Sequence, residues 1–353
     1  MSNSTTSHSQ PHGEPSDPHP SGPKRPTVAK RLVGVVAGVA GLALVVLGVV
    51  DASTSTGGSD ARNQLTFIAP ANAGGGWDGA AREAQQAVRS QGIVNNAQVV
   101  NIPGAGGTIG LSQFSEMDGE SSTMMLMGIT MLGAIRMNSS DVSLDDVTPI
   151  ARLADDYNVL VVPADSPYDT VEELLADWAK NPKAFPFGGG SLGSLDQMIV
   201  SQLATEARID PTEVSYMAYS GGAELATSLL SGTIKASVSG YADFEDQIDA
   251  GRLKALALVA EEPIDGIPFP TLIEQGYDVS LVNWRGIVAA PGITDEEKAE
   301  LEDIVTEMVQ SAEWQDALDR NQWTDSFMVG DDFEQNLQQE IETVDKIWSD
   351  LGY

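Results

Sequence analysis

The sequence predicts an α/β fold large enough for two lobes, preceded by one apolar segment near the N-terminus. Short runs of β-forming residues alternate with helical stretches throughout residues 61–353, and glycine-rich segments stand between several strands and the helices that follow them. Strands that alternate with helices of about 10–15 residues indicate parallel sheets with helices on both faces. Residues 61–353, the body of the chain, are more than one hydrophobic core usually holds and enough for two.

The first half of the body contains four predicted strands. They are the short apolar runs at residues 65–69, 98–102, 123–127 and 159–163. Helices are predicted after three of them, at residues 79–91, 109–114 and 171–180. Thr170 and Glu173 have the spacing of a capping box, which predicts where the third helix begins.

The second half repeats the alternation. Strands are predicted at residues 185–187, 214–218, 236–238 and 255–259, followed by an extended segment at 279–290. Helices are predicted at residues 195–207, in a segment ending at Leu230, at 295–310 and at 331–351. Ser194 with Gln197, and Thr294 with Glu297, have capping-box spacing. In the last helix, apolar residues three and four positions apart predict one buried face: Phe333, Leu337, Ile341, Val344, Trp348 and Leu351.

Cysteine and histidine are missing from the body. The chain has no cysteine, and its three histidines, His8, His12 and His19, lie near the N-terminus. The body therefore cannot form a zinc site from Cys or His, a Ser-His-Asp or Cys-His catalytic site, or a disulfide. Carboxylate chemistry, hard-cation sites and binding without chemistry remain.

The net charge of −32 belongs to the body, because the first 60 residues hold four basic and four acidic side chains. A body this acidic repels phosphate backbones and anionic lipids, which excludes nucleic acid as a partner. Abundant Asp and Glu with little lysine is typical of a surface adapted to high salt, and it is equally typical of an acidic shell that maintains solubility.

The N-terminal segments predict export. Residues 1–31 are rich in Ser, Thr, Pro and Gly, which predicts a disordered arm, whereas residues 32–50 are uncharged and long enough for a membrane-spanning helix. Positive charge on the N-terminal side of this segment puts residues 51–63, a polar linker, and the body outside the cytoplasm. The helix is either an uncleaved anchor or a signal peptide cut near Val50.

Four glycine-rich segments carry the functional prediction. They are Gly74 to Gly76, Gly104 to Gly110, Gly188 to Gly193, and Gly221 with Gly222. In a parallel sheet such loops meet at the carboxyl ends of the strands, where α/β proteins bind ligands. Glycine lets backbone N–H groups approach an acceptor, and each helix N-terminus adds partial positive charge. The loops predict an anion site that needs neither Lys nor Arg.

Two of these loops are similar to enzyme signatures. Residues 189–193 fit the G-x-S-x-G nucleophile elbow, with Ser191 as the nucleophile, but the body holds no histidine to activate it. Residues 104–110 approach a dinucleotide fingerprint, with Ile109 in the place of its third glycine. Asp78 follows the first loop at the expected N-cap of a helix, where it either caps that helix and pairs with Arg82 or accepts a hydrogen bond from a ligand.

Several of these segments together resemble one family. The motifs APANAGGGWDG, VVNIPGAGGTIG, GGGSLGSLDQ, AYSGGAELATSLLSG and WRGIVAAPGIT are similar to the solute-binding subunit of tripartite tricarboxylate transporters, over the body from about residue 65 to the C-terminus. The resemblance implies a type II periplasmic-binding-protein fold, with two lobes that close around a small carboxylate. It implies a hinge of two crossover strands near residues 157–160 and 281–285. The lobes would be residues 64–158 with 283–353, and residues 159–282.

The resemblance also implies which residues bind the ligand. From one lobe these are Gly75, Gly76, Trp77, Asp78, Gly106, Gly107 and Thr108, with Thr130. From the opposing lobe they are Gly190, Ser191, Ser194, Tyr219, Gly221 and Gly222, with Tyr241. No cofactor and no metal are implied. Ala73 and Gly79 depart from the family pattern in the first loop and leave the substrate open.

The resemblance implies a function without catalysis. The protein would be a monomer that captures a citrate-like di- or tricarboxylate outside the cytoplasm and delivers it to the integral membrane subunits of the transporter. It would stay at the membrane through residues 32–50 or be released after their cleavage. The alternative is a receptor that reports ligand occupancy to a sensor kinase, and a hydrolase would depend on Ser191 alone.

Overall fold

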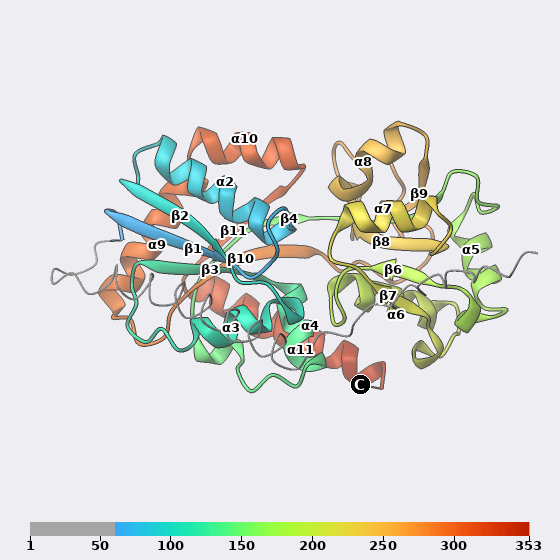
Figure 1. The fold of residues 1–353 in the computed structure, drawn as a ribbon, viewed down its shortest axis with the longest axis horizontal. Helices are drawn as coiled ribbons and strands as arrows, with labels where there is room; N and C mark the ends of the chain where they lie inside the picture. Colours follow the sequence, from blue (N-terminus) through green and yellow to red (C-terminus); the bar gives the residue numbers. More distant parts are fainter. Residues whose placement is uncertain (1–60, 353) are drawn as a thin grey trace, which may run out of the picture. The chain divides into compact units, whose positions relative to one another are not determined.

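The computed structural model describes residues 61–352, which form one compact unit with two mixed sheets (Figure 1). The predicted arm at 1–31, the predicted membrane segment at 32–50 and most of the linker at 51–63 lie outside the described residues. None of the helices within 61–352 has the length and apolar character needed to cross a bilayer.

The first sheet has six strands in the order β11-β4-β10-β3-β1-β2. They are β1 (Gln64–Ala69), β2 (Asn96–Asn101), β3 (Thr123–Gly128), β4 (Thr148–Asp156), β10 (Asn283–Ala289) and β11 (Thr324–Val329). The second sheet has five strands in the order β7-β6-β8-β5-β9. They are β5 (Asn158–Pro163), β6 (Phe187–Gly189), β7 (Tyr216–Ala218), β8 (Ala236–Gly240) and β9 (Leu253–Val259).

The prediction of parallel sheets is wrong for part of each sheet. β1 pairs in parallel with β2 and β3, but β10 runs antiparallel to both β3 and β4. In the second sheet β5 runs antiparallel to β8 and β9, whereas β6 pairs in parallel with β7 and β8. The cause is the chain path: β4 leads into β5 through Tyr157 alone, and β10 returns from the second sheet to the first without a crossover helix.

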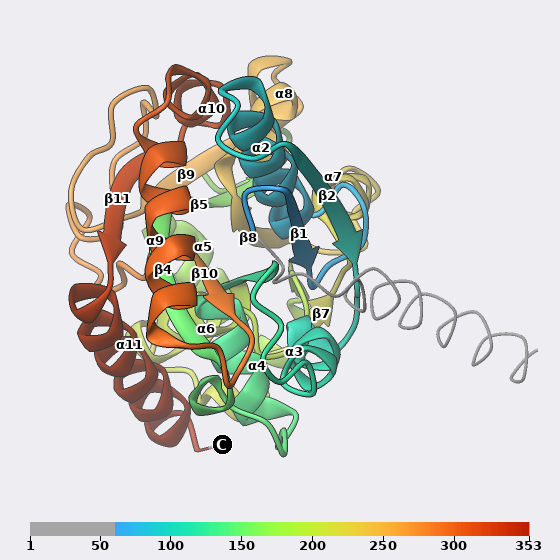
Figure 2. The same cartoon turned by 90° about the vertical axis from the view of Figure 1, so that its left-hand side faces the viewer.

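Helices cover both faces of the sheets, as the alternation predicted. They are α2 (Gly76–Ser90), α3 (Thr108–Phe114), α4 (Ile129–Met137), α5 (Val171–Trp178), α6 (Leu195–Glu206), α7 (Gly222–Leu230), α8 (Tyr241–Asp249), α9 (Asp295–Val309), α10 (Ala312–Asn321) and α11 (Asp331–Asp350). α2 and α10 lie side by side in both views (Figures 1 and 2). With α9 they bury one apolar face of the first sheet.

A second apolar core continues from the first sheet to the other. It joins α3, α4 and α11 to α5 and α6, so Trp348 of α11 and Trp178 of α5 belong to one buried cluster. A third core lies under α7 and α8. The two sheets therefore share a hydrophobic contact beside the chain crossings that connect them, and α4 lies against α6 within it.

Helix capping follows the predicted spacing. Thr294 and Glu297 form both halves of a capping box at the start of α9. Thr170 and Ser194 accept hydrogen bonds from the backbone N–H of Glu173 and Gln197 at α5 and α6. The predicted face of α11 is buried at Phe333, Leu337, Val344, Trp348 and Leu351, with Ile341 half-buried.

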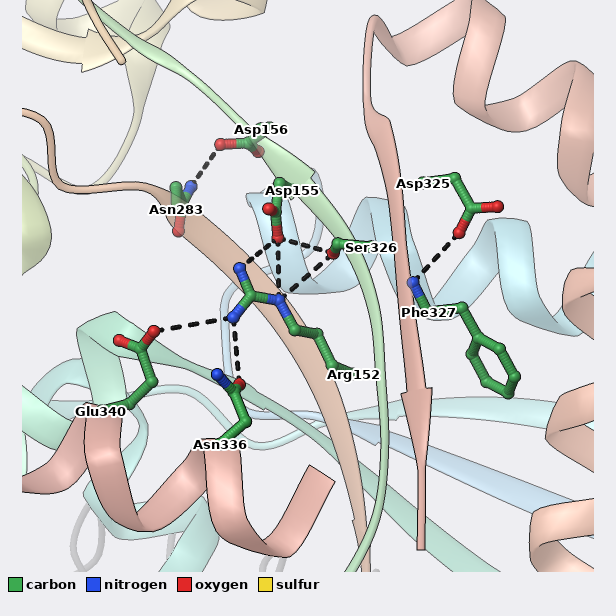
Figure 3. A network of polar contacts seen from close by, with 9 residues as sticks. All are labelled: Arg152, Asp155, Asp156, Asn283, Asp325, Ser326, Phe327, Asn336 and Glu340. Carbon is green, nitrogen blue, oxygen red and sulfur yellow. Dashed lines mark hydrogen bonds and ion pairs between the residues drawn. The ribbon is translucent and has the colours of Figure 1, made fainter. Parts of the chain in front are cut away.

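Two strands and three helices escaped the sequence analysis: β4, β11, α4, α8 and α10. β4 was missed because charged residues interrupt its apolar run. Arg152 and Asp155 in this strand form an ion pair. Asp155 also accepts a hydrogen bond from Ser326 of β11, and Arg152 also pairs with Glu340 of α11 (Figure 3). Tertiary partners thus allow charge inside a strand that the local pattern does not suggest.

Candidate functional site

A cavity of about 810 Å³ lies between loops that belong to the two sheets. All four glycine-rich segments contribute to its wall, and each of them follows a strand and precedes a helix or a helical turn. The sequence prediction that these loops stand at the carboxyl ends of strands is confirmed.

The first loop joins β1 to α2. Gly75 is the N-cap of α2, and Gly75, Gly76 and Trp77 all line the cavity. Because this is the N-terminal end of a 15-residue helix, its free N–H groups and partial positive charge favour an anion.

Asp78 does not occupy the N-cap that the sequence suggested, because α2 begins earlier than predicted, at Gly76. Its buried carboxylate accepts hydrogen bonds from Gly74 N–H at 2.8 Å, Arg82 Nε at 2.9 Å and Asn101 Nδ2 at 2.8 Å. Burial opposes ionisation, but these bonds outweigh it and the pKa of Asp78 lies below its ordinary value. Asp78 holds the first loop against β2 and is absent from the cavity wall.

The second loop, between β2 and α3, uses the conformational freedom of glycine. Gly104, Gly106 and Gly107 have φ of 131°, 63° and 95°, and all three line the cavity. Thr108 is buried and donates its hydroxyl hydrogen bond to the Ala105 carbonyl at 2.9 Å. It stabilises the turn and does not line the cavity.

The third loop, between β6 and α6, is fixed by a carboxylate. Gly190 N–H donates to Asp196 Oδ2 at 2.6 Å, and Asn158 Nδ2 donates to Asp196 Oδ1 at 2.6 Å. Gly190, Ser191 and Ser194 line the cavity. The N–H of Gly190 is therefore already occupied. Burial raises the pKa of Asp196 to about 7, against the lowering effect of these two hydrogen bonds.

The fourth loop, between β7 and α7, adds Tyr219 and Gly221 to the wall. Gly222 instead packs against the side chain of Asp243, where an added Cβ would lie 2.5 Å from Oδ1. Two other predicted residues line the cavity from outside the loops: Thr130 of α4 and Tyr241 of α8. Thr130 Oγ1 also accepts a hydrogen bond from Leu195 N–H at 3.4 Å, which links α4 to α6.

The cavity thus gathers most of the residues that the sequence singled out. Those on its wall are Gly75, Gly76, Trp77, Gly106, Gly107, Thr130, Gly190, Ser191, Ser194, Tyr219, Gly221 and Tyr241. Asp78, Thr108 and Gly222 support the loops from behind.

The fold and the cavity agree with a family comparison. Residues 80–353 match the sequence profile of TctC, the tripartite tricarboxylate transporter family receptor. The chain belongs to this family.

Relatives of this TctC-family receptor are distant in sequence. BugT from Bordetella pertussis is 25% identical over 240 residues, which cover 65% of this chain and 71% of BugT. A TctC solute-binding protein from Polaromonas, solved without ligand, is 28% identical with a TM-score of 0.64 over 82% of this chain and 98% of that one. MatC from Rhodopseudomonas palustris, with bound malate, has a TM-score of 0.70 at 19% identity over 81% of this chain and 98% of MatC. This last likeness concerns the fold.

Sequence reasoning missed the charged residues of the receptor's cavity: it predicted an anion site that needs neither Lys nor Arg, whereas an Arg lines the cavity. Arg285 of β10 lines the cavity beside Gly76 and pairs with Asp156 of β4. Its guanidinium lies 5.0 Å from the ring centroid of Trp323, and its buried Nε has no hydrogen-bond partner among the described residues. The signal available in the sequence was a single Arg inside the apolar strand NWRGIVA.

Proposed function

We propose that this TctC-family receptor captures a small di- or tricarboxylate outside the cytoplasm and delivers it to the integral membrane subunits of a tripartite tricarboxylate transporter. The observation that carries the proposal is the convergence of glycine loops, the N-terminus of α2 and Arg285 on one cavity. Backbone N–H groups and a guanidinium are the donors that a carboxylate requires. Malate in the related fold of MatC supports the same ligand class.

Capture would occur by closure of two lobes. We assign residues 64–158 with 283–353 to one lobe and 159–282 to the other, because the strands of each sheet fall within these ranges except for Asn158, the first residue of β5. The hinge would comprise residues 157–160 and 281–285, where the chain passes between the sheets. A ligand that contacts both lobes favours the closed state, and the membrane subunits would recognise that state. No step in this cycle requires bond chemistry.

A thermal-shift screen of the full chain tests the proposal. The ligands are citrate, tricarballylate, malate, succinate and glutamate at millimolar concentration, with 1,4-butanediol as the uncharged control. A carboxylate present at about 100 times its Kd stabilises the folded state by about 2.7 kcal/mol, which is a measurable rise in Tm. If none of the carboxylates raises Tm more than butanediol does, the proposal is wrong.

Delivery needs a separate measurement in cells. Deleting the gene should abolish uptake of the radiolabelled carboxylate that gives the largest thermal shift, and re-expression of the chain should restore uptake. If the deletion strain takes up the carboxylate normally but no longer shows a transcriptional response to it, the protein is a sensor of the carboxylate and not a transport receptor.

A further inference from the structure

One side of the cavity is rich in hydrogen-bond acceptors. Asn158 of β5 is 1% exposed, and its Nδ2 donates to Asp196, while its Oδ1 has no hydrogen-bond partner among residues 61–352. Asn158 pairs with Gly240 across the sheet, and both line the cavity. A buried carbonyl oxygen without a donor is costly in a folded protein, so a donor from a water or a ligand would satisfy it.

Asp243 lies beside this group, in the first turn of α8. Its Oδ2 accepts a hydrogen bond from Ser239 Oγ at 2.9 Å, and its Oδ1 lies against Gly222 without a donor among the described residues. The side chain lines the cavity and remains exposed within it. Partial loss of hydration raises the pKa of Asp243, and the hydrogen bond from Ser239 and the charge of Arg285 act in the opposite direction.

The charges of the wall do not suit a plain dicarboxylate. Three Asp side chains and one Arg side chain line the cavity: Asp156, Asp196, Asp243 and Arg285. Arg285 is paired with Asp156, and it forms no ion pair or hydrogen bond with Asn158 or Asp243 among the described residues, although its charge lowers the pKa of Asp243. A ligand that carried carboxylates only would place further negative charge near these acceptors and would offer them no proton.

We propose that this receptor selects carboxylates that also carry a hydrogen-bond-donating substituent, an ammonium or a hydroxyl, and that Asp243 is the residue that accepts from it. This inference rests on the proposed function and names the ligand subclass for the same cavity. The ligand carboxylate faces the N-terminus of α2 and Arg285, and the donor faces Asp243 and Asn158. Asp243 then determines specificity, because a ligand without the donor leaves its Oδ1 unpaired.

Three four-carbon dicarboxylates provide the test, since succinate, malate and aspartate carry hydrogen, hydroxyl and ammonium at the same carbon. Calorimetric titration of the full chain should give the affinity order aspartate, malate, succinate. The difference between aspartate and succinate should be about tenfold to a hundredfold, the range for a hydrogen bond to a charged group. Citrate should bind tighter than tricarballylate for the same reason.

The variant Asp243→Asn keeps the shape of the side chain and an acceptor for Ser239. It should weaken aspartate binding about tenfold or more and leave succinate binding within about threefold, because only the charged acceptor is lost. Asp246→Asn on the same helix is the matched control, since Asp246 is exposed and does not line the cavity. It should leave both affinities unchanged.

The outcomes separate the two proposals. The inference is overturned if wild-type protein binds succinate as tightly as aspartate, or if Asp243→Asn weakens both ligands equally. Either result leaves carboxylate capture intact. Failure of every carboxylate to bind removes the proposed function itself. The affinities of the wild-type protein for succinate, malate and aspartate test the inference even if Asp243→Asn does not fold.

Discussion

Gly107 occupies a position that is strained and crowded for any residue with a Cβ. Its φ of 95° is left-handed, and an added Cβ would lie 2.8 Å from Met131 Cε and 2.9 Å from Trp77 Cζ3. The missing side chain therefore lets Trp77, which follows the first loop, pack directly on the second loop. Two segments of the cavity wall are fixed together by this one contact.

We expect Gly107→Ala to reduce both stability and ligand affinity. Gly119→Ala is the matched control, because Gly119 also has positive φ, 75°, but has open space around its Cβ position. Both variants should lose about 1–2 kcal/mol in urea unfolding from the left-handed backbone alone. Gly107→Ala should lose more and should weaken carboxylate binding. Equal effects of the two variants on stability and on Kd would show that the packing of Trp77 on this loop is unimportant.

Strand β4 is bonded to α11 and ends at a residue that lines the cavity. Arg152 Nη2 lies 2.6 Å from Asp155 Oδ1, and Nη1 lies 3.1 Å from Asn336 Oδ1 and 3.6 Å from Glu340 Oε1 (Figure 3). These contacts fasten β4 to α11 one residue before Asp156, which reaches the cavity. Burial raises the pKa of Glu340, and the charge of Arg152 acts in the opposite direction. The strand that enters the proposed hinge is thus bonded to α11 and β11 through Arg152 and Asp155.

Removing Arg152 should be strongly destabilising. In Arg152→Ala the carboxylates of Asp155 and Glu340 lose their buried cation, which typically costs about 3–5 kcal/mol. Lys180→Ala is the comparison, because Lys180 pairs with Asp177 in a largely exposed bridge that is worth well under about 1 kcal/mol. Urea unfolding measures both. A loss below about 1 kcal/mol for Arg152→Ala would mean that solvent reaches the network and screens it.

At the scale of the whole molecule, two hydrogen bonds link elements of the two proposed lobes. Gln322, between α10 and β11, donates from Nε2 to Glu245 Oε1 of α8 at 2.8 Å. Leu195 N–H of α6 donates a hydrogen bond to Thr130 Oγ1 of α4, so a second contact joins the same two lobes. Gln322 also has a positive φ of 54°, which is uncommon outside glycine. If the lobes close as proposed, the hydrogen bond between Gln322 and Glu245 would act as a latch of the closed state.

Breaking this latch should shift the protein towards the open state. Gln322→Ala and Glu245→Ala should each weaken ligand binding about threefold to tenfold, the value of one partly exposed hydrogen bond. The double variant should bind no worse than either single variant, since the same contact is lost only once. Calorimetry gives the affinities, and small-angle scattering with and without ligand reports closure. Effects that add in the double variant would count against a direct coupling.

Local features of this protein were predictable from the sequence because neighbouring residues produce them. The capping box at Thr294, the buried face of α11 and the placement of the glycine loops all depend on side chains a few positions apart. The acidic composition and the absence of Cys and His in the body were equally available, and they limited the possible chemistry before any fold was known.

Tertiary structure alone decided the strand directions and the charges of the site. Arg285 meets Asp156 across 129 positions of the chain, and Asp243 reaches the cavity because α8 follows the strand that pairs with Asn158. Such contacts depend on the path of β4 and β10 between the two sheets, which no short sequence pattern encodes. The sequence therefore determined that glycine-rich loops would follow the strands, and the fold determined which of their N–H groups are already bonded and which charged side chains stand opposite them.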